Sequence, residues 1–300
     1  MFTGCGTALV TPFRRDGSLD EPALRALVRR QIEAGINFLV PCGTTGESPT
    51  LTRAEHLRVI EITLEEAKGV VPVLGGAGGY NTAEVIELAR ELAALGVDGV
   101  LSVTPYYNKP TQEGLYQHYK AIAGAIRNLP IIVYSVQSRT GVNVEPATLK
   151  RLAEIDNITG IKEASGNLAQ VASVVHHVPP EFVVLSGDDA VTLPVIALGG
   201  RGIISVVGNE IPGEMTRLAQ LALQNDFPEA REIQRRYLPL MEVNFVESNP
   251  IPVKAAMALM GLLEPVWRLP LLAPQPASQA KIEKVLQALG LLADRGAHAG

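Results

Sequence analysis

The amino-acid sequence predicts an α/β protein built as a (β/α)8 TIM barrel, with an appended C-terminal helical region. Two observations predict the barrel: short apolar runs alternate with longer amphipathic segments, and eight such units fill roughly the first three-quarters of the chain. Strands that alternate with helices pair in parallel through right-handed crossovers, and eight of them close on themselves. We therefore predict a catalytic barrel over residues 1–226 and a helical region packed on it over residues 227–300.

Each predicted strand is a short run of apolar and β-branched residues. In chain order, the strands are expected at Thr7–Val10, Phe38–Pro41, Val70–Leu74, Gly99–Val103, Ile131–Tyr134, Ile158–Lys162, Val183–Ser186 and Gly202–Val206. The segments between them, such as LDEPALRALVRRQIEAG, have apolar residues three and four positions apart, as one face of a helix does. An open doubly wound sheet would instead require a glycine-rich loop after the first strand, and ALVTPFRRDGSLD contains none.

The strand pattern stops near Phe227, and three helical segments follow. They are expected over residues 228–245, 249–262 and 277–292, with the proline-rich connector LPLLAPQPA before the last. The tail RGAHAG, residues 295–300, is expected to fray.

Composition excludes several classes of protein. The chain has 300 residues, of which 47% are hydrophobic and 19% charged, and a net charge of -5 without a basic block, so nucleic acid is not an expected partner. No run of eighteen apolar residues predicts a membrane span, and the N-terminus lacks the positive region of a signal peptide. Cys5 and Cys42 have no CxxC spacing, which indicates reduced thiols and a cytoplasmic protein.

Polar residues gather where the predicted strands end. In a (β/α)8 barrel, the carboxyl ends of the strands carry the active site. Those ends read GTTGES (residues 43–48), TPYYNKP (104–110), YSVQSRTG (134–141), Lys162–Glu163, SGDD (186–189) and GIISVVGN (202–209). Threonine, tyrosine, arginine, lysine and serine are all frequent in these segments, whereas the turns at the amino ends of the strands carry no such cluster of reactive side chains.

Lys162 is the most informative of these residues, because an ammonium group loses its hydration beside a barrel core. A desolvated lysine has a lowered pKa, and its neutral amine can attack a ketone to form a Schiff base. Taken alone, Lys162 reads more readily as a strand-end lysine that pairs with Glu163. Lys254 is a second candidate, but IPVKAAM resembles a helix start from which a lysine snorkels to solvent.

The neighbouring loops supply groups that suit imine chemistry. A tyrosine hydroxyl can move protons, and the turn Gly43–Thr45 offers N–H groups and hydroxyls to a carboxylate. The five histidines fall on predicted helices or the tail, so no metal and no cofactor is predicted.

Some motifs also have a purely structural interpretation. GTTGES places Glu47 three residues after Thr44, as a capping box does. For SGDD we favour an N-cap of the next helix by Asp188 or Asp189. Arg139 alone could form a surface salt bridge, which contributes little.

Taken together, the motifs GTTGES, TPYYNKPTQEGLYQHY, SRTG, GIKEASGN, SGDD and NPIPVK resemble those of the dihydrodipicolinate synthase / N-acetylneuraminate lyase family of class I aldolases. The resemblance runs from FTGCGTALVTPF to about NPIPVKAAM. It implies a lyase that condenses pyruvate with L-aspartate 4-semialdehyde to 4-hydroxy-tetrahydrodipicolinate, on the route to diaminopimelate and lysine. It also implies a homotetramer assembled as a dimer of dimers. A related aldolase acting on N-acetylneuraminate or a 2-keto-3-deoxy sugar acid, and a non-catalytic metabolite-binding paralogue, remain alternatives.

The resemblance assigns the reacting groups by position. Lys162 would form the Schiff base with pyruvate, and Tyr134 would act above it as general acid and base. Thr44 would connect Tyr134 to Tyr107 in a proton relay, with the tyrosine supplied by a neighbouring subunit.

The resemblance also assigns the binding groups. Thr45 would bind the carboxylate of pyruvate, and Arg139 that of aspartate semialdehyde. Gly187 and Ile204 would line the pocket through their backbones. The chain departs from the family pattern Tyr-Asn-x-Pro at Ser135 and Gln137, which bears on how the second substrate is held.

Family members that lysine inhibits bind it at the dimer interface. The corresponding residues here are Ser48, Pro49, Arg53, His56, Tyr80, Glu84 and Tyr106. Ser48, His56, Glu84 and Tyr106 match the sensitive pattern, so they mark an allosteric site, whereas Arg53 replaces a histidine and Tyr80 an asparagine. Because an arginine repels a cationic amino acid, we predict weak or absent inhibition by lysine.

Overall fold

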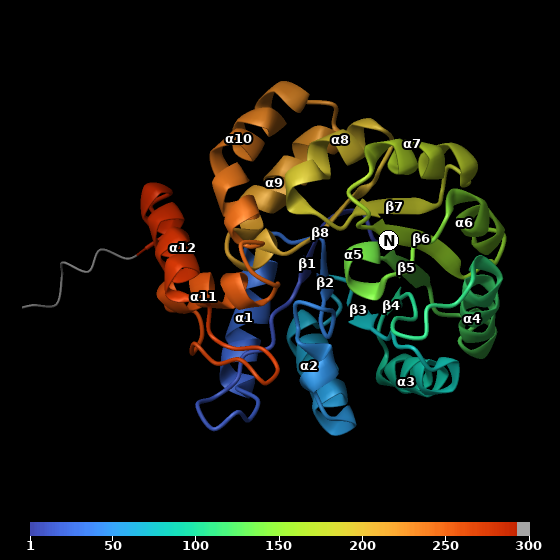
Figure 1. The fold of residues 1–300 in the computed structure, drawn as a ribbon, viewed down its shortest axis with the longest axis horizontal. Coiled ribbons are helices and arrows are strands. Elements are labelled where there is room, and N and C mark those ends of the chain that lie inside the picture. Colours follow the sequence, from blue (N-terminus) through green and yellow to red (C-terminus); the bar gives the residue numbers. More distant parts are fainter. Residues whose placement is uncertain (293–300) are drawn as a thin grey trace, which may run out of the picture.

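A computed structural model describes residues 1–292, whose eight strands form one parallel sheet (Figure 1). The strands are β1 (Gly4–Ala8), β2 (Phe38–Val40), β3 (Leu74–Gly76), β4 (Gly99–Val103), β5 (Ile131–Ser135), β6 (Ile158–Glu163), β7 (Val183–Ser186) and β8 (Gly202–Ser205). They are ordered β2-β1-β8-β7-β6-β5-β4-β3. A bridge between Leu39 and Val73 brings the two edge strands together, so the sheet is a nearly closed barrel. The predicted fold class is thereby confirmed.

The helices that follow the strands form a ring around this barrel, except the short helix α5, which lies inside the ring (Figure 1). They are α1 (Glu21–Glu33), α2 (Arg53–Ala67), α3 (Thr82–Leu95), α4 (Gln112–Ala125), α5 (Gln137–Thr140), α6 (Pro146–Leu152), α7 (Leu168–His177), α8 (Thr192–Ala197) and α9 (Pro212–Leu223). Three 3-10 turns, η1 (Ser48–Thr50), η2 (Asp189–Val191) and η3 (Val207–Asn209), lie at the carboxyl ends of strands. Local sequence sets many of the boundaries; Thr52 and Glu55 form a capping box at the start of α2, for example.

Each predicted strand overlaps or adjoins an observed one, and those at Gly99–Val103 and Val183–Ser186 coincide with β4 and β7. The first and third predictions are displaced, because β1 and β3 contain glycines, which strand propensity disfavours. Close packing requires those glycines. A Cβ atom on Gly6 would lie 2.1 Å from the Phe38 ring, and one on Gly76 would lie 2.0 Å from the Cys42 carbonyl oxygen.

Two apolar layers hold the barrel together. The inner layer fills the barrel and includes Phe38, Leu101, Ile132, Tyr134 and Ile204. The outer layer lies between the strands and the surrounding helices. Side chains of a strand alternate between the two layers, so neighbouring residues at a strand end have different surroundings.

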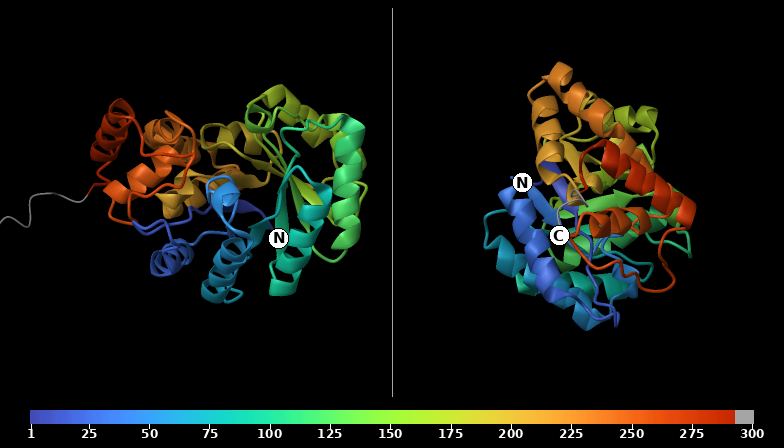
Figure 2. Two further views of the ribbon diagram at one scale, coloured as in Figure 1. Left: turned by 60° about the horizontal axis from the view of Figure 1, so that its bottom comes forward. Right: turned by 90° about the vertical axis from the view of Figure 1, so that its left-hand side faces the viewer.

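Three further helices follow the barrel on one side of the molecule (Figure 2). They are α10 (Phe227–Val243), α11 (Ile251–Leu259) and α12 (Pro276–Ala288). Helix α10 packs on α9, and α12 packs on α10 and α11.

The division of the chain into a barrel over residues 1–226 and a helical region over residues 227–300 stays a proposal. The expected fraying of residues 295–300 lies outside the described residues. Among residues 1–292, no helix is both long and apolar enough to cross a membrane.

Candidate active site

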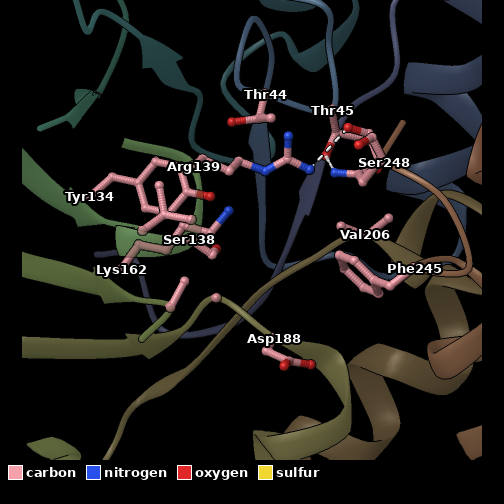
Figure 3. A pocket seen from close by; sticks show the side chains of 14 residues that line it. Thr44, Thr45, Tyr134, Ser138, Arg139, Lys162, Asp188, Val206, Phe245 and Ser248 are labelled. Atoms are coloured by element: carbon pink, nitrogen blue, oxygen red, sulfur yellow. Dashed lines mark hydrogen bonds between the residues drawn. The ribbon is translucent and has the colours of Figure 1, made fainter. Parts of the chain in front are cut away.

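A cavity of about 550 Å³ opens at the carboxyl ends of the strands (Figure 3). The turn after β2, the ends of β5 to β8 and the loop between α10 and α11 form its wall. Six of the residues predicted for catalysis or substrate binding line it: Thr44, Thr45, Tyr134, Arg139, Lys162 and Gly187. Residues from distant parts of the sequence thus meet at one site.

Lys162 and Tyr134 face each other inside the barrel. They are register partners on β6 and β5, so both side chains point to the same face. The Lys162 Nζ atom lies 4.3 Å from the centroid of the Tyr134 ring, and Lys162 is only 5% exposed. Within residues 1–292, Lys162 forms no ion pair. A buried amine beside a phenol is therefore presented to the cavity.

Glu163 points the other way, so the interpretation of Lys162 as its ion-pair partner is wrong. The Glu163 carboxylate accepts hydrogen bonds from Gln170 Nε2 at 2.9 Å and from the Ser165 N–H at 3.3 Å. Burial raises the pKa of Glu163, and these hydrogen bonds oppose that rise. The alternation of side chains along β6 separates the two charges onto opposite faces of the sheet.

Gly187 makes room for the Lys162 side chain. A Cβ atom at Gly187 would lie 2.6 Å from the Ala164 Cβ and 3.2 Å from the Lys162 Cε. Any larger residue would therefore displace the amine or its neighbour. The end of β7 approaches the amine this closely only because residue 187 is a glycine.

The turn Gly43–Ser48 brings Thr44 and Thr45 to the cavity. The Glu47 N–H donates to the Thr44 carbonyl at 3.1 Å, and Glu47 has a left-handed backbone with φ of 52°. The expected capping box of Thr44 and Glu47 is wrong, because the Glu47 side chain turns inward to Lys254.

Arg139 extends across the cavity toward Thr45 and Ser248 (Figure 3). Its Nη2 donates to the Asn249 carbonyl at 3.0 Å, and Asn249 Nδ2 donates to Thr45 Oγ1 at 2.9 Å. With residues 1–292 Arg139 forms no ion pair, so the surface salt bridge is not found. Asn249 was not predicted as a site residue, although the motif NPIPVK that contains it signalled its importance.

Lys254 is not a snorkelling lysine, which corrects the prediction for the start of α11. Its side chain and that of Glu47 are fully buried, and Lys254 Nζ lies 2.5 Å from Glu47 Oε1. Burial lowers the pKa of Lys254, and the charge of Glu47 opposes that shift. Lys254 thus forms an ion pair and does not line the cavity, so among residues 1–292 Lys162 is the one lysine in the cavity lining.

Ser135 and Gln137 lie outside the cavity. Ser135 points to the outer layer, where its hydroxyl donates to Asn143 Oδ1 at 3.3 Å and accepts from the Val144 N–H at 3.1 Å. Gln137 is exposed at the start of α5. The departures from the family pattern therefore do not alter the side chains that line the cavity.

Two predicted site residues lie away from the cavity wall. Ile204 is fully buried in the inner layer, and Val206 lines the wall two residues later. Tyr107 is 90% exposed, with a left-handed backbone at φ of 63°.

Asp188 lines the cavity and is also the N-cap of η2, as predicted for SGDD. Its side chain accepts a hydrogen bond from the Ala190 N–H at 3.0 Å.

A second cavity of about 230 Å³ contains all the residues expected at an effector site. These are Ser48, Pro49, Arg53, His56, Tyr80, Glu84 and Tyr106. Arg53 forms an ion pair with Glu91 at 2.7 Å, and the rings of Tyr80 and Tyr106 meet edge to face at 5.1 Å. Burial lowers the pKa of His56, whose Nε2 lies 2.8 Å from the Gly76 carbonyl oxygen.

The charges of the first cavity suit an anionic carbonyl compound. The lining of this cavity includes two basic side chains, Lys162 and Arg139, and a single carboxylate, that of Asp188. No three His, Cys, Asp or Glu side chains within residues 1–292 lie close enough to hold a metal ion. A buried amine, a phenol and a guanidinium can together bind a 2-oxo acid, form an imine with it and move protons.

Comparison with known proteins agrees with this chemistry. The Dihydrodipicolinate synthetase family matches residues 1–289. A 4-hydroxy-tetrahydrodipicolinate synthase from Koribacter versatilis is 54% identical over 290 residues, which cover 96% of each chain. The crystal structure of dihydrodipicolinate synthase from Aquifex aeolicus superimposes with a TM-score of 0.95 at 43% identity, covering 98% of this chain and all of that one. An Acinetobacter baumannii dihydrodipicolinate synthase complexed with pyruvate has a TM-score of 0.95 at 41% identity, covering 97% and 100%.

Proposed function

The chain belongs to the dihydrodipicolinate synthetase family, and from this membership we infer that it is a lyase that condenses pyruvate with L-aspartate 4-semialdehyde. The product is 4-hydroxy-tetrahydrodipicolinate, on the route to diaminopimelate and lysine. The observation that carries the inference is the buried Lys162 amine, which faces Tyr134 inside a cavity that Arg139 crosses.

We propose the following roles for these residues. The neutral amine of Lys162 attacks C2 of pyruvate, and loss of water leaves an imine. A proton leaves C3, and the resulting enamine forms a carbon–carbon bond with the aldehyde carbon of the semialdehyde. The amino group of that substrate then attacks the imine carbon, closes the ring and releases Lys162. One water is lost overall, and Tyr134 moves the protons.

The binding groups follow from charge and position. Thr45 and the turn around it bind the pyruvate carboxylate, and the guanidinium of Arg139 binds the carboxylate of the semialdehyde. Gly187 contributes backbone beside the reacting carbon, and Ile204 supports it from the inner layer. We also propose a cytoplasmic location, because Cys5 and Cys42 are buried free thiols, as expected for a reducing compartment.

Borohydride trapping tests the imine. The protein is incubated with pyruvate, reduced and digested, and the modified lysine is identified by mass spectrometry. An adduct on Lys162 supports the proposal, whereas no adduct, or one on Lys254, contradicts it. Coupled assays with aspartate semialdehyde and with N-acetylneuraminate then separate the proposed substrate from a sugar acid. Ser135 and Gln137, the residues that suggested a sugar acid, lie outside the cavity, and this position supports aspartate semialdehyde as the second substrate.

We propose that the active enzyme is a homotetramer assembled as a dimer of dimers, in which Tyr107 enters the cavity of a neighbouring subunit. Its 90% exposure in the single chain supports this role, because the ring is free to contact another subunit.

Tyr107→Phe is expected to slow turnover by about 100-fold, the low end of the contribution of a proton-transfer group. Imine formation and stability should be unaffected, because only an exposed hydroxyl is lost. Steady-state rates and borohydride trapping measure the two effects. Tyr116→Phe is the matched control, since Tyr116 lies on α4 beneath Arg151, away from the cavity. Full activity of Tyr107→Phe would rule out the relay between subunits.

Lysine is expected to inhibit weakly or not at all. Arg53 adds a positive charge to the second cavity, and the Tyr80 ring occupies part of it. Turnover should therefore stay nearly constant as L-lysine is raised through the micromolar range. The double variant Arg53→His/Tyr80→Asn should gain sensitivity, because it restores the pattern of inhibited relatives. A steep loss of wild-type activity at micromolar lysine would refute the prediction.

A further inference from the structure

Two segments far apart in the sequence form one wall of the active-site cavity. The first is the turn Gly43–Ser48, and the second is the segment Asn249–Lys254, which enters α11. Two links join them. Asn249 Nδ2 donates to Thr45 Oγ1 at 2.9 Å, and Lys254 Nζ donates to Glu47 Oε1 at 2.5 Å. In the second segment, the Asn249 carbonyl also accepts a hydrogen bond from Arg139 Nη2.

The Lys254–Glu47 pair is unusual because both side chains are 0% exposed. Taking two charges out of water is unfavourable, and apolar replacements of a buried pair are often equally stable. Stability alone therefore does not account for the pair. What an ion pair provides and apolar contacts do not is a fixed direction and distance between two atoms.

The turn needs such fixing, because its backbone is strained. Cys42, just before the turn, and Glu47, within it, have left-handed φ values of 56° and 52°. Non-glycine residues keep this conformation only where their surroundings hold them. Glu47 is held through both oxygens, since the Arg268 N–H donates to Oε2 at 3.2 Å. Lys254 is held as well, with Nζ lying 4.4 Å from the centroid of the Phe13 ring.

We propose that Lys254 and Glu47 are positioning residues, whose ion pair sets the place of the carboxylate-binding wall. Through Glu47 the pair holds the Thr44–Thr45 turn, and through Asn249 it holds Thr45 and the guanidinium of Arg139. Neither residue lines the cavity. The inference rests on the proposed function, because it assumes that this wall binds pyruvate.

The test removes the pair, and its double variant does so without leaving an unpaired buried charge. Lys254→Met, Glu47→Gln and the double variant Lys254→Met/Glu47→Gln are compared with the wild-type protein. Each single variant leaves one buried charge without a partner and could fail to fold. The double variant buries no charge, so it decides the test in that case. For each, pyruvate is titrated, the imine is trapped with borohydride, and the fraction of modified Lys162 gives the half-saturating concentration.

The half-saturating pyruvate concentration should rise about tenfold in Lys254→Met and in the double variant. Trapping at saturating pyruvate should remain complete, because Lys162 and Tyr134 are untouched. Asn157→Ala is the control. Asn157 precedes β6, and its Nδ2 donates to the carbonyls of Ala123, Ile126 and Leu129, so its loss should lower the unfolding midpoint in urea without changing half-saturation.

The outcomes separate the two proposals. A folded double variant whose half-saturation stays within about twofold of the wild-type value would overturn the positioning role, as would an equal shift in Asn157→Ala. Failure of the wild-type protein to form any adduct would instead overturn the proposed function.

Discussion

Lys162→Met is expected to abolish catalysis and pyruvate trapping together. The amine is the attacking atom, and losing a covalent nucleophile typically lowers the rate by more than about 1,000-fold. The fold should survive, since methionine has a similar length and Lys162 is buried without an ion pair among residues 1–292. The substitution keeps a side chain of similar volume in a buried position and breaks no ion pair, so the urea midpoint should hold.

Steady-state turnover, borohydride trapping and urea unfolding measure these effects on one sample. Lys150→Met is the matched control, because Lys150 is an exposed lysine at the end of α6 and its loss should change none of the three. An adduct that persists in Lys162→Met, on Lys254 or elsewhere, would show that another amine forms the imine.

Tyr134→Phe is expected to lower kcat by about 10²- to 10⁴-fold, the usual contribution of a positioned acid and base. The ring that covers the Lys162 amine at 4.3 Å is retained, so the variant isolates the hydroxyl. Stability should change little, because the Tyr134 hydroxyl donates to no group within residues 1–292. Single-turnover kinetics with pyruvate would show whether imine formation, or only the later proton transfers, is slowed.

Tyr119→Phe provides the contrast. Tyr119 is also a buried tyrosine, but its hydroxyl donates to the Ser102 carbonyl at 3.0 Å behind the barrel wall. Its loss should lower the free energy of unfolding by about 1 kcal/mol and leave kcat unchanged. If Tyr134→Phe kept full activity, Tyr134 would not be the group that moves the protons.

Periodicity in the sequence was enough to predict the barrel. Alternating strands and helices determine the topology, and the topology places all strand ends at one face. The displaced predictions at β1 and β3 have a single cause. Their glycines are poor strand formers, and only the neighbouring Phe38 ring and Cys42 carbonyl explain why glycine is needed there.

For the cavity, the family resemblance of the motifs identified six residues that the structure brings to the lining of one cavity: Lys162, Tyr134, Thr44, Thr45, Arg139 and Gly187. The orientation of individual side chains was harder. Ser135 follows Tyr134 directly, yet it faces the outer layer, and the same alternation separates Glu163 from Lys162. Orientation depends on the register within the closed barrel, which a list of strand ends does not contain.

By itself, the sequence determined the fold class, and through its family resemblance it led to the proposed strand-end site with a lysine as nucleophile. Those features depend on local periodicity and on motifs a few residues long. Only the tertiary structure showed that Lys254 forms a buried ion pair, because its partner Glu47 lies 207 positions away in the sequence. Likewise, Asn249 and Thr45, which are hydrogen-bonded to each other, are 204 positions apart. No local pattern encodes such pairs, since they form only when the chain closes around the cavity and removes both groups from water.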